Sequence, residues 1–486
     1  MTAGTLSASG ARISGDDYQH LFAWCLMLQA LQTGSEIAAL GVEDPAAGNV
    51  DDVTLYPRQG RDRYYQVKFS VDARQLVNVQ WLTSPSRAGG QSILQRFHQT
   101  WKDQQRSTRP ELTLVTNRPL DPDDPVLTMR DGKDGTVDKP LARATPSSAL
   151  GKARQQLAQH LNIDETELLA FLGDLRFRIG KLHNEWKDHA ALLMCVLGLR
   201  QDEASIQAGI GLVRGWVTSG KRQLTVDEVR AQVAALHLDT EQPAASLLVQ
   251  ALDYDLMPES ATLTLDWVAL HEGQEPRTRR RLHDPRIYNE RLRPELLEAA
   301  RQLRAGGHSR IFVRGTMRLP TWFTVGTTFA KTASFNVMAL QGGQLWASKG
   351  EVVDFPLATI LEKELGSGDE LTLVVSLATD ISQDVQAYLS TGVPDAGRYV
   401  CLAPPTGSNN GAIRTAAEAR GCAFKIRDLA RQYARTCGSN KFHLFLAMPG
   451  GLALLLGHLW DRMPATQLYE DLGGSSGYLP SFLIPN

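Results

Sequence analysis

The sequence has few cysteines and no long apolar run, and these two absences exclude several protein classes. Its five cysteines among 486 residues are scattered and form no Cys-x-x-Cys pair, which argues against a disulfide framework and against a zinc site. No stretch reaches about 18 consecutive apolar residues, and the first residues lack the basic and apolar regions of a signal peptide. The sequence therefore predicts a cytoplasmic protein with reduced cysteines and no membrane segment.

An excess of charge of either sign is also lacking. Lys and Arg number 51 against 53 Asp and Glu, a net charge of -2, so the whole chain is not patterned as a polyanion binder. One local exception lies between Arg277 and Arg293, where seven arginines gather around two acids. Two interpretations stay open for this segment: a solvated loop, or recognition of phosphate by guanidinium groups.

The length predicts more than one domain, because folded domains usually contain about 100 to 200 residues. Hydrophobic residues make up 43% and charged residues 21%, which is typical of folded globular chains. The pattern changes from mixed helices and strands to an all-helical block at about residue 148, and strands return after a Pro-containing linker at 240–245. We expect domains at 1–147, 148–239 and 246–486, with an α/β fold overall.

Each predicted domain has its own element pattern. The first is expected to hold a helix at 16–32 that buries one face, strands at 50–56, 64–69 and 112–117, and a helix at 91–105. The second is expected to hold only helices, at 148–161, 164–177, 188–199 and 225–236. In the third, strands are expected at 310–314, 335–340, 344–347, 370–377, 398–402 and 441–447, and helices at 294–305, 381–389, 411–433 and 451–460.

Acidic, amide and lysine side chains cluster along the first strands. Side chains alternate between the faces of a strand, so Gln66 and Lys68 share one face of the strand at 64–69. A hard divalent cation prefers oxygen ligands, and Asp52, Gln66 and Glu43 are able to supply them. A lysine beside the cation stabilises charge on a phosphate. Asp52 is favoured over Asp51, because Val53 and Leu55 have the parity of a core face. The alternative is an ordinary exposed hairpin.

The order of these segments resembles the PD-(D/E)xK nuclease domains of bacterial anti-phage effectors. The similar features are the helix that begins Gly-Asp-Asp-Tyr-Gln, a Glu, the Asp-Asp strand, the Tyr-Tyr-Gln-Val-Lys strand and the Leu-Thr-Leu-Val-Thr-Asn strand. The resemblance implies a restriction-endonuclease-like fold with a helical extension and a Mg²⁺ or Mn²⁺ ion held by Asp52, Gln66 and Glu43. It implies Lys68 as the catalytic lysine and Gln19 as a supporting residue. Gln66 departs from the commoner acid at its position.

Two predicted strands in the last third of the chain end in turns that lead directly into helices. One ends at Pro449, Gly450 and Gly451, and the other ends at Thr379 and Asp380. A helix N-terminus presents backbone N–H groups to an anion, and the carboxyl ends of parallel strands are the usual place for a ligand in α/β domains. We expect a ligand with several phosphates there. A tight turn without a ligand is the alternative at each position.

The C-terminal half resembles the SAVED domain, a sensor made of two fused CARF-like (Rossmann-like) halves. The similar stretches are 312–320, 324–329, 344–348, 373–381 and 443–458. The resemblance implies binding of a cyclic di- or trinucleotide made by a partner nucleotidyltransferase. Arg318, Lys331 and Trp346 join the two strand ends as candidate ligand residues, although Trp346 also suits a core position.

Together the two resemblances imply a SAVED-type effector nuclease of cyclic-oligonucleotide-based anti-phage signalling (CBASS). Such a protein is expected to form a homo-oligomer when its cyclic oligonucleotide binds, and then to cleave double-stranded DNA with a metal ion. Two rivals stay open. One is a constitutive restriction-type endonuclease that recognises modified DNA, and the other is a nucleotide-gated scaffold with an inactive nuclease fold.

Overall fold

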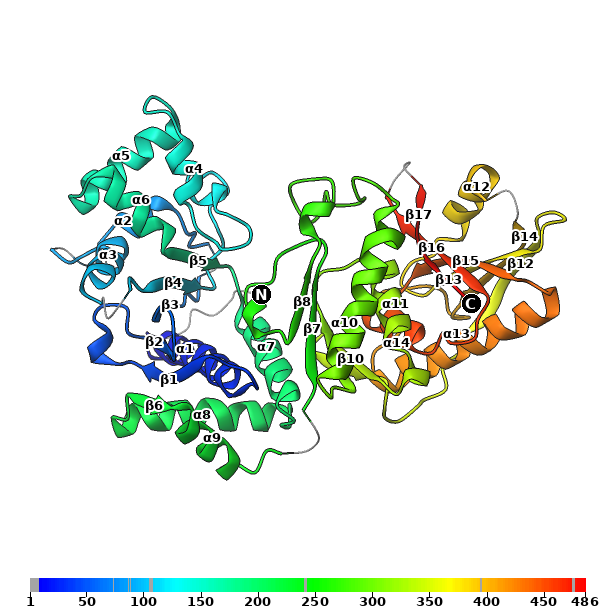
Figure 1. The fold of residues 1–486 in the computed structure, drawn as a ribbon, viewed down its shortest axis with the longest axis horizontal. Helices are drawn as coiled ribbons and strands as arrows, with labels where there is room; N and C mark the ends of the chain where they lie inside the picture. Colours follow the sequence, from blue (N-terminus) through cyan, green and yellow to red (C-terminus); the bar gives the residue numbers. More distant parts are fainter. Residues whose placement is uncertain are drawn as a thin grey trace. The chain divides into compact units, whose positions relative to one another are not determined.

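The computed structural model describes residues 8–72, 74–85, 87, 89–104, 108–239, 243–393, 396–473 and 477–486. It divides into two compact units, Met1–Gln242 and Pro243–Asn486 (Figure 1). The helical block expected at 148–239 thus lies in the same unit as residues 1–147. The first part of the expected linker, residues 240–242, lies outside the described residues. Within the described residues, no helix combines the length and apolar composition that a membrane span requires.

A single mixed sheet forms the centre of the first unit, with strand order β5-β4-β3-β2-β1-β6. The β3–β4–β5 part is parallel, and β1 pairs with β2 and β6 in antiparallel fashion, as β2 does with β3. The strands are β1 (Ile37–Val42), β2 (Val53–Pro57), β3 (Arg63–Lys68), β4 (Glu111–Thr116), β5 (Leu175–Ile179) and β6 (Gln223–Thr225). The helices are α1 (Ala8–Leu31), α2 (Val79–Thr83), α3 (Ile93–Asp103), α4 (Asp138–Arg143), α5 (Ala149–Leu161), α6 (Glu165–Gly173), α7 (His183–Val196), α8 (Glu203–Ser219) and α9 (Val226–Ala235).

Two sequence expectations for this unit are wrong. The block after residue 148 is not all-helical, because β5 and β6 belong to it and complete the two edges of the sheet. The first helix is not buried on one face only, since every residue from Leu21 to Leu28 is fully buried. Helix α1 contacts β1 and β3 on one side and α7, α8 and α9 on the other. An apolar sequence on all sides suits a helix enclosed in this way.

The opposite face of the sheet supports a separate core. Tyr64, Leu112, Leu114 and Phe177 of the strands pack there with apolar side chains of α3 to α6. Tyr65, on the other face of β3, packs against Phe22 of α1. Because side chains alternate along a strand, Gln66 and Lys68 lie on the same face as Tyr64.

Two sheets form the second unit. The first has the order β11-β10-β9-β7-β8 and the second β12-β14-β13-β15-β16-β17. Strands β14, β13, β15 and β16 are parallel, and the edge strands β12 and β17 are antiparallel to their neighbours. The strands are β7 (Ala245–Gln250), β8 (Leu263–Asp266), β9 (Arg310–Arg314), β10 (Asn336–Gln341), β11 (Gln344–Ala347), β12 (Ala358–Glu364), β13 (Glu370–Ser376), β14 (Ala396–Ala403), β15 (Lys441–Ala447), β16 (Ala465–Asp471) and β17 (Tyr478–Ile484). The helices are α10 (Arg293–Ala305), α11 (Leu319–Thr328), α12 (Ser382–Gly392), α13 (Ala416–Cys437) and α14 (Gly450–His458).

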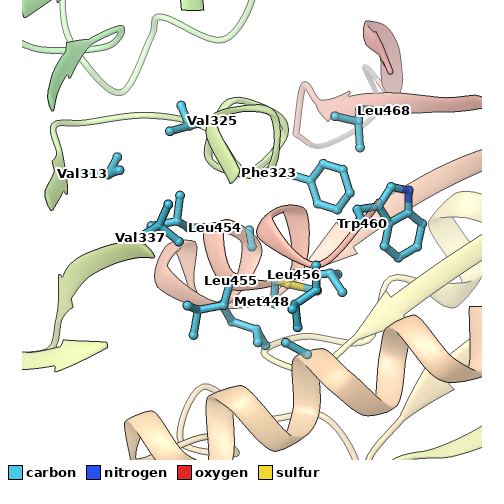
Figure 2. Close-up of a cluster of buried hydrophobic side chains, with 14 of the residues drawn as sticks. Val313, Phe323, Val325, Val337, Met448, Leu454, Leu455, Leu456, Trp460 and Leu468 are labelled. Carbon is cyan, nitrogen blue, oxygen red and sulfur yellow. The ribbon is translucent and has the colours of Figure 1, made fainter. Parts of the chain in front are cut away.

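Helices α11 and α14 pack closely and join the two halves of this unit. Each follows a parallel strand, α11 after β9 of the first sheet and α14 after β15 of the second. Around them, Phe323 and Trp460 pack edge to face with ring centroids 5.4 Å apart (Figure 2). The backbones approach at two glycines: a Cβ on Gly326 would lie 2.2 Å from the Leu454 carbonyl oxygen, and one on Gly457 would lie 2.1 Å from that of Phe323. No other residue type fits these two positions.

Candidate functional site

Three neighbouring strands bring Glu43, Asp52 and Gln66 into register. Val42 pairs with Val53, and Val53 pairs with Tyr65, so the next position of each strand continues the ladder. The Glu43 N–H donates to the Asp52 carbonyl oxygen at 3.1 Å. Directly opposed residues of antiparallel strands project on one face. The structure therefore places the Asp52 and Gln66 side chains together, with the backbone of Glu43 beside Asp52.

Side-chain contacts form two separate sets here, one at Asp52 and one at Glu43. The Gln66 Nε2 donates to Asp52 Oδ2, and the Val67 N–H donates to the same oxygen at 2.6 Å. Gln19 of α1 donates through Nε2 to Glu43 Oε1 at 3.3 Å. We call Glu43, Asp52, Gln66 and Lys68 the strand-end cluster, since they lie at or just beyond the ends of β1, β2 and β3.

Burial dominates the electrostatics of the strand-end cluster. It raises the pKa of the Asp52 carboxyl, and the positive charge of Lys68 opposes that rise. Burial likewise raises the pKa of Asp51, again opposed by Lys68. A carboxylate withdrawn from water is stabilised by a nearby cation, and Lys68 supplies that charge. Asp52, not Asp51, makes the contact with Gln66.

The donor set suits a hard divalent cation. The described residues contain no group of three or more His, Cys, Asp or Glu side chains able to hold a metal ion, so a site here needs other oxygen ligands besides carboxylates. The Asp52 and Glu43 carboxylates and the Gln66 amide carbonyl are oxygen donors of the kind that Mg²⁺ prefers. The Gln66 N–H group now donates to Asp52, which leaves its carbonyl oxygen for another partner.

Arg222 also belongs to this site, and the sequence did not indicate it. Its Nη1 lies 3.1 Å from Glu43 Oε2. Glu43 itself has a positive φ of 45°, a left-handed conformation that non-glycine residues adopt at a cost and that is enriched at functional sites. The Arg222–Glu43 contact has no local sequence signal, because it joins residues 179 positions apart.

In the second unit, the carboxyl ends of neighbouring strands form one edge. The N–H groups of Leu377 and Ala378, after β13, both donate to the Ala447 carbonyl oxygen of β15 at 2.9 Å. This places the turn that contains Thr379 and Asp380 beside the turn that contains Pro449 and Gly450. The loop at 407–411 packs over the first turn, where Asn409 N–H donates to the Leu377 carbonyl oxygen.

Arg318 lies at the start of α11 and contacts the neighbouring strand β16. Its Nε is 3.6 Å from Glu470 Oε1, and its Nη2 donates to the Arg279 carbonyl oxygen at 3.3 Å. The Nε atom is buried and makes no hydrogen bond to any described residue. We call Arg318, Thr379, Asp380, Gly450 and Glu470 the carboxyl-edge group.

Burial raises the pKa of Glu470 to about 8, and the charge of Arg318 opposes the rise. In the unfolded chain this carboxyl returns to the ordinary glutamate pKa of 4.5, so between pH 4.5 and pH 8 the unfolded state releases a proton that the folded state keeps. We expect the free energy of unfolding to fall as pH rises across this interval. Glu470→Gln should remove that slope and stabilise the protein at pH 8 by about 4 kcal/mol. Denaturant unfolding at pH 5 and pH 8 measures both values; parallel pH profiles for the two proteins would contradict the assignment.

The other candidate ligand residues do not all gather at this edge. Lys331 follows the C-terminal end of α11, one helix length of about 15 Å from Arg318, and its Nζ lies 5.6 Å from the Phe424 ring centroid. Trp346 is buried, with 2% of its surface exposed. The Gly451 N–H already donates to Gln341 Oε1 at 3.0 Å. Trp346 and the Gly451 N–H are therefore occupied by structural contacts, while Lys331, Thr379 and Asp380 are exposed.

The basic segment 277–293 is largely paired within its own unit. Arg279 and Arg280 donate to the carbonyl oxygens of Leu252 and Leu472. Three further arginines of the segment pair with carboxylates: Arg281 with Glu272, Arg286 with Asp284 and Arg291 with Glu295. These contacts favour the solvated-loop interpretation of the segment.

Comparison with known proteins connects the second unit to a family. Residues 292–484 match the family described as "SMODS-associated and fused to various effectors sensor domain", or SAVED. The second unit carries a SAVED domain. It contains both strand ends of the carboxyl-edge group, together with Arg318 and Glu470.

Likenesses to individual proteins extend along the whole chain. The chain is 24% identical over 504 residues to "CD-NTase-associated protein 4" of Enterobacter hormaechei subsp. hoffmannii (strain UCI 50), covering 97% of this chain and 98% of that protein. Among solved structures, a Cap4 SAVED/CARF-domain containing receptor of Acinetobacter baumannii with the cyclic trinucleotide 3'3'3'-cAAA matches at 13% identity with a TM-score of 0.41, covering 100% of both chains. A Moraxella osloensis Cap4 receptor matches at 13% identity with a TM-score of 0.39, covering 97% of this chain and 99% of that one.

Proposed function

We propose that this protein is a CBASS effector in which a cyclic oligonucleotide bound to the SAVED unit activates a metal-dependent nuclease in the first unit. The observation that carries the proposal is the presence, in one chain, of a SAVED domain and of the strand-end cluster in a separate compact unit. The likeness to CD-NTase-associated protein 4 over 97% of the chain supports pairing the two units. Residues 1–239 then form the nuclease, of the PD-(D/E)xK type, and residues 246–486 the sensor.

The carboxyl-edge group supports binding of an anion with several phosphates. The turns after β13 and β15 lie side by side, so two helix N-termini start at one edge of the sheet, where backbone N–H groups favour phosphate. Arg318 adds a guanidinium whose buried Nε makes no hydrogen bond to described residues. A cyclic di- or trinucleotide carries two or three phosphates on one ring, so it offers an anionic group to more than one of these places. Lys331, which is exposed, and Trp346, which is buried and would have to move to take part, stay further candidates.

In the first unit, each residue of the strand-end cluster has a role in phosphodiester hydrolysis. Asp52, Glu43 and the Gln66 amide oxygen would hold a Mg²⁺ or Mn²⁺ ion, which supplies Lewis-acid polarisation of the phosphate and a more acidic water. Gln19 fixes Glu43 through its amide, and the Val67 N–H fixes Asp52. Lys68 opposes the rise in the pKa of Asp52 that burial causes, and it stabilises the charge that develops on the phosphate.

Association of protomers is part of the proposal. One such centre cuts one strand, so a double-strand break uses two centres brought together. Ligand-driven association would make cleavage depend on the signal, because the binding free energy of the ligand favours the assembled state. Sedimentation velocity should therefore show a larger species after ligand addition, and the monomer alone in both conditions would contradict this part.

The test of the proposal is duplex DNA cleavage by the full chain with Mg²⁺ and a panel of cyclic di-, tri- and tetranucleotides. The panel includes the cyclic trinucleotide 3'3'3'-cAAA. We expect cleavage with one member of the panel and none without a ligand. Cleavage without any nucleotide would favour the restriction-type enzyme, and tight ligand binding without cleavage would favour the inactive scaffold.

A further inference from the structure

The helical block contributes an edge strand to the nuclease sheet. Strand β6 pairs with β1 in antiparallel fashion, with Leu40 opposite Leu224 and Gly41 opposite Gln223 (Figure 1). The Val42 N–H donates to the Arg222 carbonyl oxygen at 2.9 Å, and Gln223 Nε2 donates to Asp44 Oδ2 at 2.6 Å. These bonds hold Arg222 next to the end of β1, where Glu43 begins the turn.

Arg222 occupies the side of Glu43 that Gln19 leaves open. Glu43 Oε2 is 3.1 Å from Arg222 Nη1, and Glu43 Oε1 accepts from Gln19 at 3.3 Å. Both carboxylate oxygens thus have protein partners. The two charged side chains are partly exposed, 33% for Arg222 and 39% for Glu43, so the guanidinium is able to turn toward water without leaving a buried charge unpaired.

We infer that Arg222 competes with a divalent cation for Glu43 and thereby sets the ion concentration at which the strand-end cluster becomes loaded. The inference rests on the proposed function, because it takes Glu43 as a metal ligand. A guanidinium and a metal ion both bind carboxylate oxygen, and two cations beside one carboxylate repel each other. The helical block therefore carries an internal counter-ion for the catalytic unit.

A purely structural role of Arg222 predicts the opposite sign. If Arg222 only held Glu43 in position, its removal would loosen a ligand and weaken metal binding. If Arg222 competes, its removal frees one oxygen, removes one positive charge, and strengthens metal binding. Misfolding cannot produce a gain in affinity, so the sign of the change separates the two roles.

The test is calorimetric titration of the full chain with Mn²⁺, without DNA and at constant ionic strength. We expect Arg222→Ala to lower the Kd for Mn²⁺ by about tenfold, and Arg222→Lys to stay near the wild-type value because it keeps the charge. In Glu43→Gln, adding Arg222→Ala should produce no gain, because the contested carboxylate is absent.

Arg214→Ala is the matched control. Arg214 of α8 pairs with Asp17 of α1, so its removal also breaks an ion pair between the helical block and α1 but leaves Glu43 untouched. The control should bind Mn²⁺ as the wild type does. An unchanged or higher Kd in Arg222→Ala overturns the inference while the proposed nuclease stands. A wild-type protein that binds no Mn²⁺ contradicts the proposed function and the inference together.

Discussion

Replacing Lys68 by alanine should abolish DNA cleavage and leave ligand binding unchanged. The charge of Lys68 opposes the rise in the pKa of Asp52 that burial causes, and Lys68 lies on the same face of β3 as Gln66. Loss of one preorganised positive group at a phosphate commonly reduces the rate by at least about 100-fold. The SAVED unit is a separate compact unit, so its affinity for the cyclic oligonucleotide should not change. Single-turnover cleavage and calorimetric ligand titration measure the two properties on the same preparation.

Lys139→Ala is a suitable control for this variant. Lys139 lies on α4 of the same unit and pairs with Asp131 and Asp134 on the surface, and exposed pairs contribute little to stability. We expect wild-type cleavage from it. Unchanged cleavage in Lys68→Ala would contradict the assignment of the strand-end cluster as the catalytic site.

Gly457→Ala should destabilise the SAVED unit strongly. The added methyl group would lie 2.1 Å from the Phe323 carbonyl oxygen, so α11 and α14 must move apart and disturb the core that they share with Trp460. Overpacking of this kind costs about 3 kcal/mol, which lowers the Tm of a unit of this size by roughly 10 °C. Thermal unfolding followed by tryptophan fluorescence measures the change, and ligand binding should weaken at the same time.

A second helical glycine gives the comparison. Gly215 lies on α8, where an added Cβ meets no atom within 4 Å. Gly215→Ala should therefore be neutral or stabilising, by up to about 1 kcal/mol, because alanine favours the helix. Equal stability of the two variants would show that the α11–α14 contact does not hold the two halves of the unit together.

Strands rich in apolar residues could be predicted from the sequence. The expected strand at 441–447 coincides with β15, and the one at 112–117 differs from β4 by one residue at each end. Helix α11 was not predicted, because its segment is rich in threonine and contains glycine, which have low helix propensity. Packing against α14 overrides that propensity. The helix expected at 164–177 is divided into α6 and β5, since Leu175–Ile179 pairs with β4.

The candidate site was predictable where it depends on local spacing. The two-residue spacing of Gln66 and Lys68 places them on one face of β3, and the pairing of β2 with β3 then places Asp52 opposite Gln66. The Arg222 contact was not predictable, because β6 has three residues and its pairing is decided by tertiary packing. Lys331 was named with Arg318 as a candidate ligand residue, and it lies beyond the other end of α11, a helix that the sequence pattern did not indicate.

The central claim is that ligand bound to the SAVED unit switches on cleavage in the first unit. The most direct test measures the Kd of the activating cyclic oligonucleotide by calorimetry and the concentration that gives half-maximal DNA cleavage, for the wild type and for Arg318→Ala. If ligand binding switches on cleavage, the Kd and the half-maximal activating concentration should agree for each protein. In Arg318→Ala both should rise together, by about tenfold or more. Cleavage that stays constant across the ligand titration, or an activation midpoint that does not follow the Kd, would contradict the account.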